Sequence, residues 1–302
     1  MGRKVLLVYG GFSAERAVSI SSKDDIYQAL TSKGYEVIEH DLTDIWNFLQ
    51  VLKEEKPDVV FNGLYGNWGE DGEIQAFLDM LQIPYTHSGL YASAAGMNKY
   101  LTLLIAQSLG IKTAAAEKTD IATYLQKGSA IPYPHVVKPV SDGSSVGVYI
   151  IKKPTDTAKI KLSEYKDEIL VERYIPGQEL TVMCLLNKAY VVTELRAKNE
   201  FYDYNAKYTS GLTEHILPAE IPEDVAEKAK DYAVRLHMAL GCNTLSRCDF
   251  RYNPDDGVVL LEINTNPGLT KLSLVPEQAK YAGISFADLC DILIKNATCR
   301  KR

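Results

Sequence analysis

The sequence predicts an α/β (α+β) protein whose first domain is built on a parallel sheet. Val5–Tyr9 is a short apolar run typical of a buried strand, and Gly10-Gly11 then leads into a helical stretch that ends near Lys33. Strand, glycine turn and helix in this order open many α/β domains that bind nucleotides. A length of 302 residues is enough for two or three compact units, each with its own core.

Strands and helices continue to alternate through the first part of the chain. Branched and aromatic runs predict strands, and apolar residues at helical spacing predict helices. The predicted elements are strands at Tyr35–Asp41, Asp58–Leu64 and Ile83–Thr86, and helices at Ile45–Glu55, Glu73–Leu81 and Met97–Leu109.

The pattern changes near residue 131, where strands joined by loops replace the alternation. The predicted strands are Pro134–Pro139, Val148–Ile151, Ile169–Ile175 and Leu180–Leu186, and amphipathic helices follow at Val225–Leu240 and Phe286–Ala297. We therefore divide the chain into residues 1–95, 96–180 and 181–302.

Composition excludes several functional classes. A net charge of −6 and a pI near 5.5 argue against a broad nucleic-acid surface. The dinucleotide fingerprint G-x-G-x-x-G is missing after the first strand, which argues against a nicotinamide enzyme. The five cysteines lack the spacing of a zinc site, so we expect reduced thiols. With neither a signal peptide nor a run of about 20 apolar residues, we expect a cytoplasmic protein without membrane contact.

A predicted hairpin between Ser246 and Gly268 holds the most informative polar residues. The turn 253–257, Asn-Pro-Asp-Asp-Gly, separates two strand-like runs. Side chains alternate along a strand, so Arg247 and Asp249 share a face, as do Glu262 and Asn264. If the strands pair, the side-chain oxygen atoms of Asp249, Glu262 and Asn264 meet in one patch of the kind that binds Mg²⁺. A surface hairpin with solvated charges explains the same residues, and both interpretations stay open at this point.

Other candidate residues also have ordinary explanations when taken singly. A carboxylate near the start of a helix, such as Glu15, is stabilised by the helix dipole even without a ligand. A lysine on an amphipathic helix, such as Lys99, is by default exposed to solvent. Residues 142–147, Asp-Gly-Ser-Ser-Val-Gly, offer backbone N–H groups to phosphate or form a simple turn. The tyrosine-rich segment 201–208 is either a packed loop or a lid over a substrate.

Six motifs in a fixed order bring these residues together. Their order and spacing resemble the D-alanine–D-alanine ligase family of ATP-grasp enzymes over nearly the whole chain. The motifs are Gly10-Gly11-x-Ser13-Ala14-Glu15-Arg16, Gly69-Glu70-Asp71-Gly72-x-Ile74-Gln75, Val137-Lys138-Pro139, Gly143-Ser144-Ser145-Val146-Gly147, Phe201-Tyr202-Asp203-Tyr204-x-Ala206-Lys207-Tyr208 and Glu262-x-Asn264-Thr265-x-Pro267-Gly268.

The resemblance implies a three-domain ATP-grasp ligase that joins two D-alanines for peptidoglycan synthesis. ATP, the co-substrate, phosphorylates the first D-alanine, and the amine of the second attacks the acyl phosphate. The resemblance also implies two Mg²⁺ or Mn²⁺ ions per active site, and a homodimer.

The resemblance further assigns roles to individual residues. For substrate and catalysis they are Glu15 on the first ammonium, Ser144 and Tyr208 as its hydrogen-bond partners, Arg247 and the Gly268 N–H on the tetrahedral intermediate, and Tyr65, Ser273 and Leu274 around the second D-alanine. For ATP they are the phosphate-binding Lys99, Lys138, Ser145, Val146 and Lys207, the adenine hinge Glu172, Tyr174 and Ile175, Glu179 on the ribose, and Val136, Phe201 and Leu261 lining the site. For metal they are Asp249, Glu262 and Asn264.

Two positions depart from the family pattern. Tyr65 stands where many members carry histidine, and a tyrosine does not titrate near neutral pH. Asn98 replaces a usual aspartate in Met97-Asn98-Lys99. Tyr208, by contrast, favours a dipeptide product over a D-lactate ester. The rival interpretations are another ATP-grasp carboxylate–amine ligase, a nucleotide-binding module without catalysis and, least supported by motifs, an NAD-binding protein.

Overall fold

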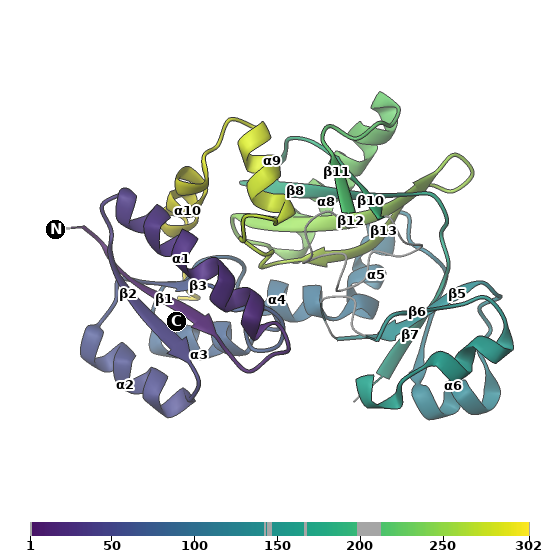
Figure 1. The fold of residues 1–302 in the computed structure, drawn as a ribbon, viewed down its shortest axis with the longest axis horizontal. Helices are drawn as coiled ribbons and strands as arrows, with labels where there is room; N and C mark the ends of the chain where they lie inside the picture. Colours follow the sequence, from purple (N-terminus) through teal and green to yellow (C-terminus); the bar gives the residue numbers. More distant parts are fainter. Residues whose placement is uncertain (1, 142, 144–146, 166–167, 198–212, 302) are drawn as a thin grey trace.

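The computed structural model describes residues 2–141, 143, 147–165, 168–197 and 213–301. Within them three sheets form three units that surround a central region (Figure 1). The chain therefore has the three-domain α/β architecture predicted from its motifs, with a parallel sheet in the N-terminal domain.

The N-terminal domain is a three-stranded parallel sheet in the order β2-β1-β3. Alternation along β1 sends Val5 and Leu7 to one face, under α1, and Leu6 and Val8 to the other, under α2 and α3. Its elements are β1 (Lys4–Gly10), α1 (Arg16–Ser32), β2 (Glu36–Leu42), α2 (Ile45–Glu55), β3 (Val59–Asn62) and α3 (Glu73–Leu81).

A pair of short helices leads from this domain to the central one, whose antiparallel sheet has the order β4-β7-β5-β6. The linking helices are α4 (Leu90–Met97) and α5 (Lys99–Ser108). The central elements are β4 (Ala116–Asp120), α6 (Ile121–Lys127), β5 (His135–Pro139), β6 (Tyr149–Ile151), the 3₁₀ turns η1 (Pro154–Lys159) and η2 (Leu162–Glu164), and β7 (Glu168–Arg173).

The C-terminal domain is built on an antiparallel sheet with the strand path β11-β10-β8-β12-β13, while β9 pairs with β8. One face packs on α8 through residues such as Val182, Cys248 and Phe250. Its elements are β8 (Gln178–Leu185), β9 (Lys188–Ala189), β10 (Thr193–Ala197), β11 (Thr213–Ile216), α8 (Glu223–Leu240), β12 (Leu245–Asn253), β13 (Gly257–Asn264), α9 (Leu274–Tyr281) and α10 (Phe286–Lys295).

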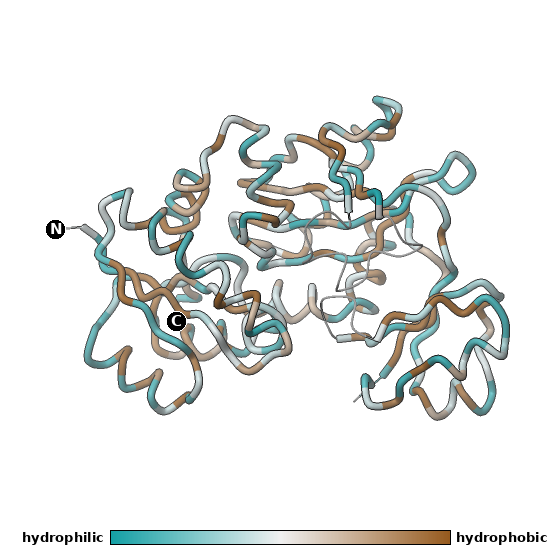
Figure 2. The backbone as a smooth tube through the Cα atoms, in the orientation of Figure 1, coloured by the Kyte–Doolittle hydropathy of each residue, from teal (hydrophilic) through white to brown (hydrophobic). Residues whose placement is uncertain are grey.

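The end of the chain returns to the N-terminal domain. Leu289 and Leu293 of α10 are fully buried in the cluster that contains Val5 and Leu7, and α10 lies beside α1 in Figure 1. Thr298 pairs through its backbone with Tyr85. Figure 2 shows the same organisation, with hydrophobic segments concentrated in the strands and in the inner parts of α9 and α10. The N-terminal and C-terminal domains thus share one apolar core.

Two predicted elements differ from the structure. Residues 83–86 form isolated bridges through Tyr85 rather than a strand, because Tyr85 meets only single residues of β3 and of the chain end. The helix predicted from Met97 begins at Lys99 instead. Asn98 has an extended backbone, and its side-chain oxygen accepts a hydrogen bond from the Leu101 N–H at 2.9 Å. An N-cap of this kind ends α4 and starts α5.

No helix of the described chain is long and apolar enough to cross a membrane.

Candidate active site

The predicted hairpin is present, and its register brings the polar side chains together. β12 and β13 are antiparallel, with Arg247 opposite Asn264 and Asp249 opposite Glu262. These residues lie on the face of the sheet that α8 does not cover, because Cys248 and Phe250 take the α8 face. A bulge between Asp249 and Phe250 shifts the register immediately beyond the polar patch. The sheet itself therefore assembles the patch.

Each carboxylate of the patch lies near a cation. The Arg247 guanidinium donates from Nε and Nη2 to the two oxygens of Asp249, at 3.0 and 2.8 Å, and Thr181 Oγ1 also donates to Asp249 at 2.6 Å. The Glu262 carboxylate lies 3.5 Å from Lys99 Nζ. Lys99 is 8% exposed, so it is a buried residue of this site and not a solvated helix residue.

The donor set fits a hard divalent cation. Asp249, Glu262 and Asn264 supply two carboxylates and an amide oxygen, which are the ligand types that Mg²⁺ and Mn²⁺ take while they keep waters and phosphate oxygens. The described residues hold no group of three or more His, Cys, Asp or Glu side chains arranged for a metal. A metal at this position would therefore depend on the amide and on substrate oxygens as well as on the two carboxylates.

A cleft lies over this patch and draws its walls from all three domains. Glu15 and Tyr65 come from the N-terminal domain, Lys99 from α5, and Gly143 from the loop after β5. The C-terminal domain supplies the remaining predicted members, namely Arg247, Glu262, Asn264, Gly268, Ser273 and Leu274. Predicted residues that are far apart in the sequence, such as Glu15 and Leu274, therefore line the same cleft.

Glu15 occupies the N-cap position of α1 without accepting a hydrogen bond there from the helix N–H groups. Its side chain is only 9% exposed and points into the cleft toward Gly143, where an added Cβ would lie 2.6 Å from Glu15 Oε1. A residue with a side chain at position 143 would thus collide with this carboxylate. The Glu15 carboxylate and the Gly143 backbone therefore lie side by side in the cleft.

Two of the residues predicted to bind the nucleotide lie on paired strands of the central sheet. Lys138 on β5 and Glu172 on β7 are both buried and form an ion pair. Glu172 Oε2 takes part in this pair, whereas Glu172 Oε1 is buried and has no hydrogen-bond partner among the residues that the structure describes. A buried orphan acceptor is costly, and an amino donor such as the exocyclic amine of adenine would satisfy it.

The segment after β7 is held against the C-terminal sheet. Arg251 of β12 donates from Nε to the Ile175 carbonyl at 3.1 Å and pairs with Glu179 at 3.1 Å, while its guanidinium lies 6.0 Å from the centre of the Tyr174 ring. Gly177, at φ +106°, has the Tyr252 carbonyl oxygen only 2.1 Å from where a Cβ would be. The close approach requires glycine and fixes the path of the segment.

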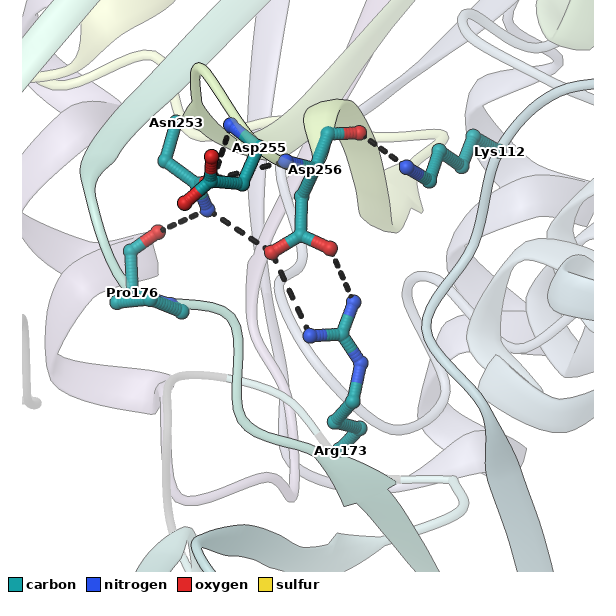
Figure 3. Close-up of polar contacts among 6 residues, drawn as sticks. All are labelled: Lys112, Arg173, Pro176, Asn253, Asp255 and Asp256. Carbon is teal, nitrogen blue, oxygen red and sulfur yellow. Dashed lines mark hydrogen bonds and ion pairs between the residues drawn. The ribbon is translucent and has the colours of Figure 1, made fainter.

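The tip of the β12–β13 hairpin contacts the same segment a second time (Figure 3). The Asp256 carboxylate accepts from Arg173 Nη2 and Nη1 at 2.5 and 3.4 Å and from Asn253 Nδ2 at 3.0 Å. Asn253 Nδ2 also donates to the Pro176 carbonyl at 3.0 Å, and Lys112 Nζ donates to the Asp256 carbonyl. Hydrogen bonding to Arg173 lowers the pKa of Asp256. Both ends of segment 173–176 are thereby pinned to one turn.

Glu70 is a cleft residue to which sequence reasoning gave no role. Removal from water raises the pKa of Glu70 well above its ordinary value, and the negative charge of Glu15 raises it further. The sequence could have indicated Glu70 as a site residue, because it lies within the motif Gly69-Glu70-Asp71-Gly72. Met97, Thr270 and Leu272 also line the cleft, and no sequence pattern distinguished them.

The remaining site predictions have different outcomes. Val136, Lys138, Glu172, Tyr174, Ile175, Glu179 and Leu261 lie outside the cleft lining described above, on β5, β7, the segment that follows it, β8 and β13. Ser144, Ser145, Val146, Phe201, Lys207 and Tyr208 lie outside the described residues.

Known proteins share both the sequence and the fold. The family described as D-ala D-ala ligase C-terminus matches residues 98–295, and its N-terminus counterpart matches residues 46–88. A D-alanine–D-alanine ligase of Rhodospirillum rubrum is 44% identical over 302 residues, covering 99% of both chains. The corresponding ligase of a Ruegeria species is 43% identical, covering 99% of this chain and 97% of its own.

Crystal structures of D-alanine–D-alanine ligases and of a related ligase have a similar fold. The D-alanine–D-alanine ligase from Bacillus anthracis superposes with a TM-score of 0.84 at 30% identity, covering 98% of this chain and 97% of its own. The structure of the same enzyme complexed with ATP superposes with a TM-score of 0.82 at 29% identity, with the same coverage of both chains. The VanG D-Ala:D-Ser ligase from Enterococcus faecalis gives 0.80 at 25% identity, covering 98% and 99%.

The fold and the cleft between its domains define an ATP-grasp ligase. Within that class, the chain belongs to the D-alanine–D-alanine ligase family.

The shifted pKa of Glu70 predicts a pH-dependent stability. As pH rises above the ordinary carboxyl value near 4.5, the unfolded chain releases this proton while the folded protein retains it, so the free energy of unfolding falls. Glutamine cannot ionise. Glu70→Gln should therefore match the wild type near pH 4.5 and become progressively more stable than the wild type toward pH 8, as measured by urea denaturation.

The control for this experiment is Glu54→Gln on α2, which removes an exposed carboxylate outside the cleft. Solvent hydrates that carboxylate in both states, so no such trend should appear. If the free energies of unfolding of Glu70→Gln and the wild type differed by the same amount across this pH range, Glu70 would be ionised in the folded protein.

Proposed function

We propose that the cleft joins two D-alanines to D-alanyl-D-alanine, with ATP converted to ADP and phosphate. The observation that carries the proposal is the meeting of Glu15, Lys99, Arg247, Glu262 and the Gly268 loop in one cleft. This set contains a carboxylate for an ammonium group, cations for phosphoryl oxygens, metal-type ligands and an oxyanion donor, as a ligation through an acyl phosphate requires. In the family the product enters peptidoglycan synthesis.

The first half-reaction activates a carboxylate. A carboxylate oxygen of the first D-alanine attacks the γ-phosphorus of ATP, the bond to the β-phosphate oxygen breaks, and ADP leaves with that electron pair. Glu15 holds the ammonium group of this D-alanine by charge and hydrogen bonding. Lys99 and Lys138 compensate the negative charge of the phosphates, together with Lys207 and the backbone of Ser145 and Val146.

The nucleotide occupies the region between the central and C-terminal domains. Glu172 accepts from the adenine amine with its orphan Oε1, and Tyr174 and Ile175 present the hinge backbone. Glu179 contacts the ribose. Hydrophobic contacts with the base come from Val136, Phe201 and Leu261.

Asp249, Glu262 and Asn264 would hold Mg²⁺ or Mn²⁺, two ions by our expectation. A divalent ion there supplies positive charge to the oxygens of the transferring phosphoryl group. The chain itself prepares this position, because the ladder between β12 and β13 sets Asp249 opposite Glu262. Lys99, 3.5 Å from Glu262, adds a fixed positive charge on the same side.

The second half-reaction forms the peptide bond. The amine of the second D-alanine attacks the carbonyl carbon, the carbonyl oxygen becomes negative, and phosphate leaves as the tetrahedral intermediate collapses. The amine loses a proton in the same sequence. Arg247 and the Gly268 N–H stabilise the oxyanion, with Ser144 and Tyr208 keeping Glu15 in place. Ser273 and Leu274 receive the carboxylate of the second D-alanine.

Further properties remain predictions, the assembly from the family resemblance and the others from the sequence pattern. They are a homodimeric assembly, a cytoplasmic location and domain boundaries near residues 95 and 180. Sheet membership supports the second boundary approximately, because β7 belongs to the central sheet and β8, which begins at Gln178, belongs to the C-terminal one.

Product identification tests the function directly. The purified protein, given ATP, Mg²⁺ and D-alanine, should release phosphate and form D-alanyl-D-alanine, detected by mass spectrometry. Equal concentrations of D-serine, D-lactate and L-alanine should not displace D-alanine as second substrate. The absence of D-alanine-dependent phosphate release would refute the proposal, and a mixed product with D-serine or D-lactate would move the protein to a neighbouring specificity.

Glu262→Gln tests the metal ligands. Loss of one charge beside a divalent ion should lower turnover roughly 10- to 100-fold at fixed Mg²⁺ and shift the Mg²⁺ titration to higher concentration, with little change in thermal stability. The control Glu168→Gln removes a strand carboxylate that pairs with Lys118 at 2.8 Å and should leave the titration unchanged. Coincident Mg²⁺ titrations for Glu262→Gln and wild type would remove Glu262 from the metal site.

Asp256→Asn tests the nucleotide hinge. The substitution removes the negative charge that pins Arg173, and a partly exposed pair of this kind contributes up to about 1 kcal/mol, or roughly a fivefold change in affinity. The KM for ATP should rise severalfold while the KM for D-alanine stays constant. Asp231→Asn breaks an exposed pair with Arg235 on α8 and serves as control. Parallel increases in both KM values would argue against a role confined to ATP.

A further inference from the structure

Tyr65 lines the cleft together with Glu15 and Gly268. It belongs to the loop after β3, and its side chain is 3% exposed. The hydroxyl accepts a hydrogen bond from the Leu269 N–H at 3.0 Å and donates one to Ser22 Oγ at 3.2 Å. Ser22 Oγ in turn donates to the Ser19 carbonyl at 2.9 Å. A continuous chain of hydrogen bonds therefore joins the C-terminal loop to helix α1.

The backbone of Tyr65 is tied to the start of the same helix. Ser13 Oγ donates to the Tyr65 carbonyl at 2.6 Å and accepts from the Glu15 N–H at 3.1 Å. Both the carbonyl and the hydroxyl of Tyr65 are thus fixed relative to α1, whose N-cap is Glu15. Because these bonds are buried or half-buried, they are stronger than they would be in water.

The loop that carries Gly268 is held at both sides of that residue. Asn266 Nδ2 donates to the Leu64 carbonyl at 2.8 Å, and the Leu269 N–H donates to Tyr65. Farther along, the Thr270 N–H donates to Ser273 Oγ at 3.0 Å. The two bonds nearest to Gly268 both end on residues 64 and 65 of the N-terminal domain. The direction of the Gly268 N–H is therefore set from that domain.

We propose that Tyr65 is a positioning residue for peptide-bond formation: its hydroxyl holds the Leu269 N–H, and so sets the Gly268 N–H at a fixed place relative to Glu15. Because this role rests on the proposed function, it concerns the second half-reaction, in which the oxyanion develops. The first half-reaction needs no oxyanion donor at the carbonyl carbon and does not depend on the hydroxyl.

Burial explains why a tyrosine can perform this task. It raises the pKa of Tyr65 to about 12, so the hydroxyl keeps its proton at neutral pH. A protonated phenol accepts from Leu269 and donates to Ser22 at the same time. The side chain thus holds two elements together without changing its charge.

Tyr65→Phe tests the proposal because it removes the hydroxyl and keeps the ring. Loss of the hydrogen bond from the Leu269 N–H, worth about 0.5–1.5 kcal/mol, predicts a kcat for the dipeptide reduced roughly 2- to 12-fold, with an unchanged KM for ATP. The first half-reaction, followed by D-alanine-dependent migration of ¹⁸O between the bridging and non-bridging positions of ATP, should keep its wild-type rate. Ser22→Ala leaves the bond to Leu269 in place and should reduce kcat by a smaller factor.

Tyr85→Phe is the matched control. Tyr85 is 2% exposed and donates from its hydroxyl to Asp79 at 3.0 Å, in the same domain but outside the cleft lining. Its loss should lower the melting temperature without separating the two half-reactions. Equal slowing of both half-reactions in Tyr65→Phe, or the same kinetic pattern in Tyr85→Phe, would overturn the positioning role. A wild-type protein that forms no dipeptide would instead refute the proposed function.

Discussion

Backbone pairing of β12 with β13 is the constraint on which the site depends. The pairing sets Arg247 opposite Asn264 and Asp249 opposite Glu262, and β8 on the other side of β12 brings Thr181 to Asp249. A slip of one residue would turn these side chains into the core beneath α8 and would expose Cys248 and Phe250 instead. The hydrophobic effect on one face of the sheet therefore fixes the polar chemistry of the other face.

Polar contacts join the C-terminal domain to each of the other two domains, and the N-terminal and C-terminal domains also share one apolar core. Tyr65 and Asn266 join the N-terminal domain to the Gly268 loop. Arg173 and Asp256 join the central domain to the hairpin tip. The first contacts lie beside the Gly268 loop and the second beside the segment after β7, so the β12–β13 hairpin and the loop that follows it contact both neighbouring domains.

Acidic and basic side chains lie together in the described part of the cleft. Burial raises the pKa of Glu70, and the negative charges of Glu15 and Glu262 raise it further. Lys99 and Arg247 offset part of this negative charge. Acidic and basic groups in such proximity retain their interactions, because little water screens them.

The sequence by itself determined the hairpin, the alternation of its faces and the six motifs, because strand period, turn residues and glycine loops are local properties of the chain. It also determined the family, through motif order. Only the tertiary structure decided that Lys99 is buried beside Glu262, that the hydroxyl of Tyr65 holds Leu269, and that Glu70 faces Glu15. These contacts join residues that are distant in sequence, and their partners follow from how the domains pack, which no local pattern encodes.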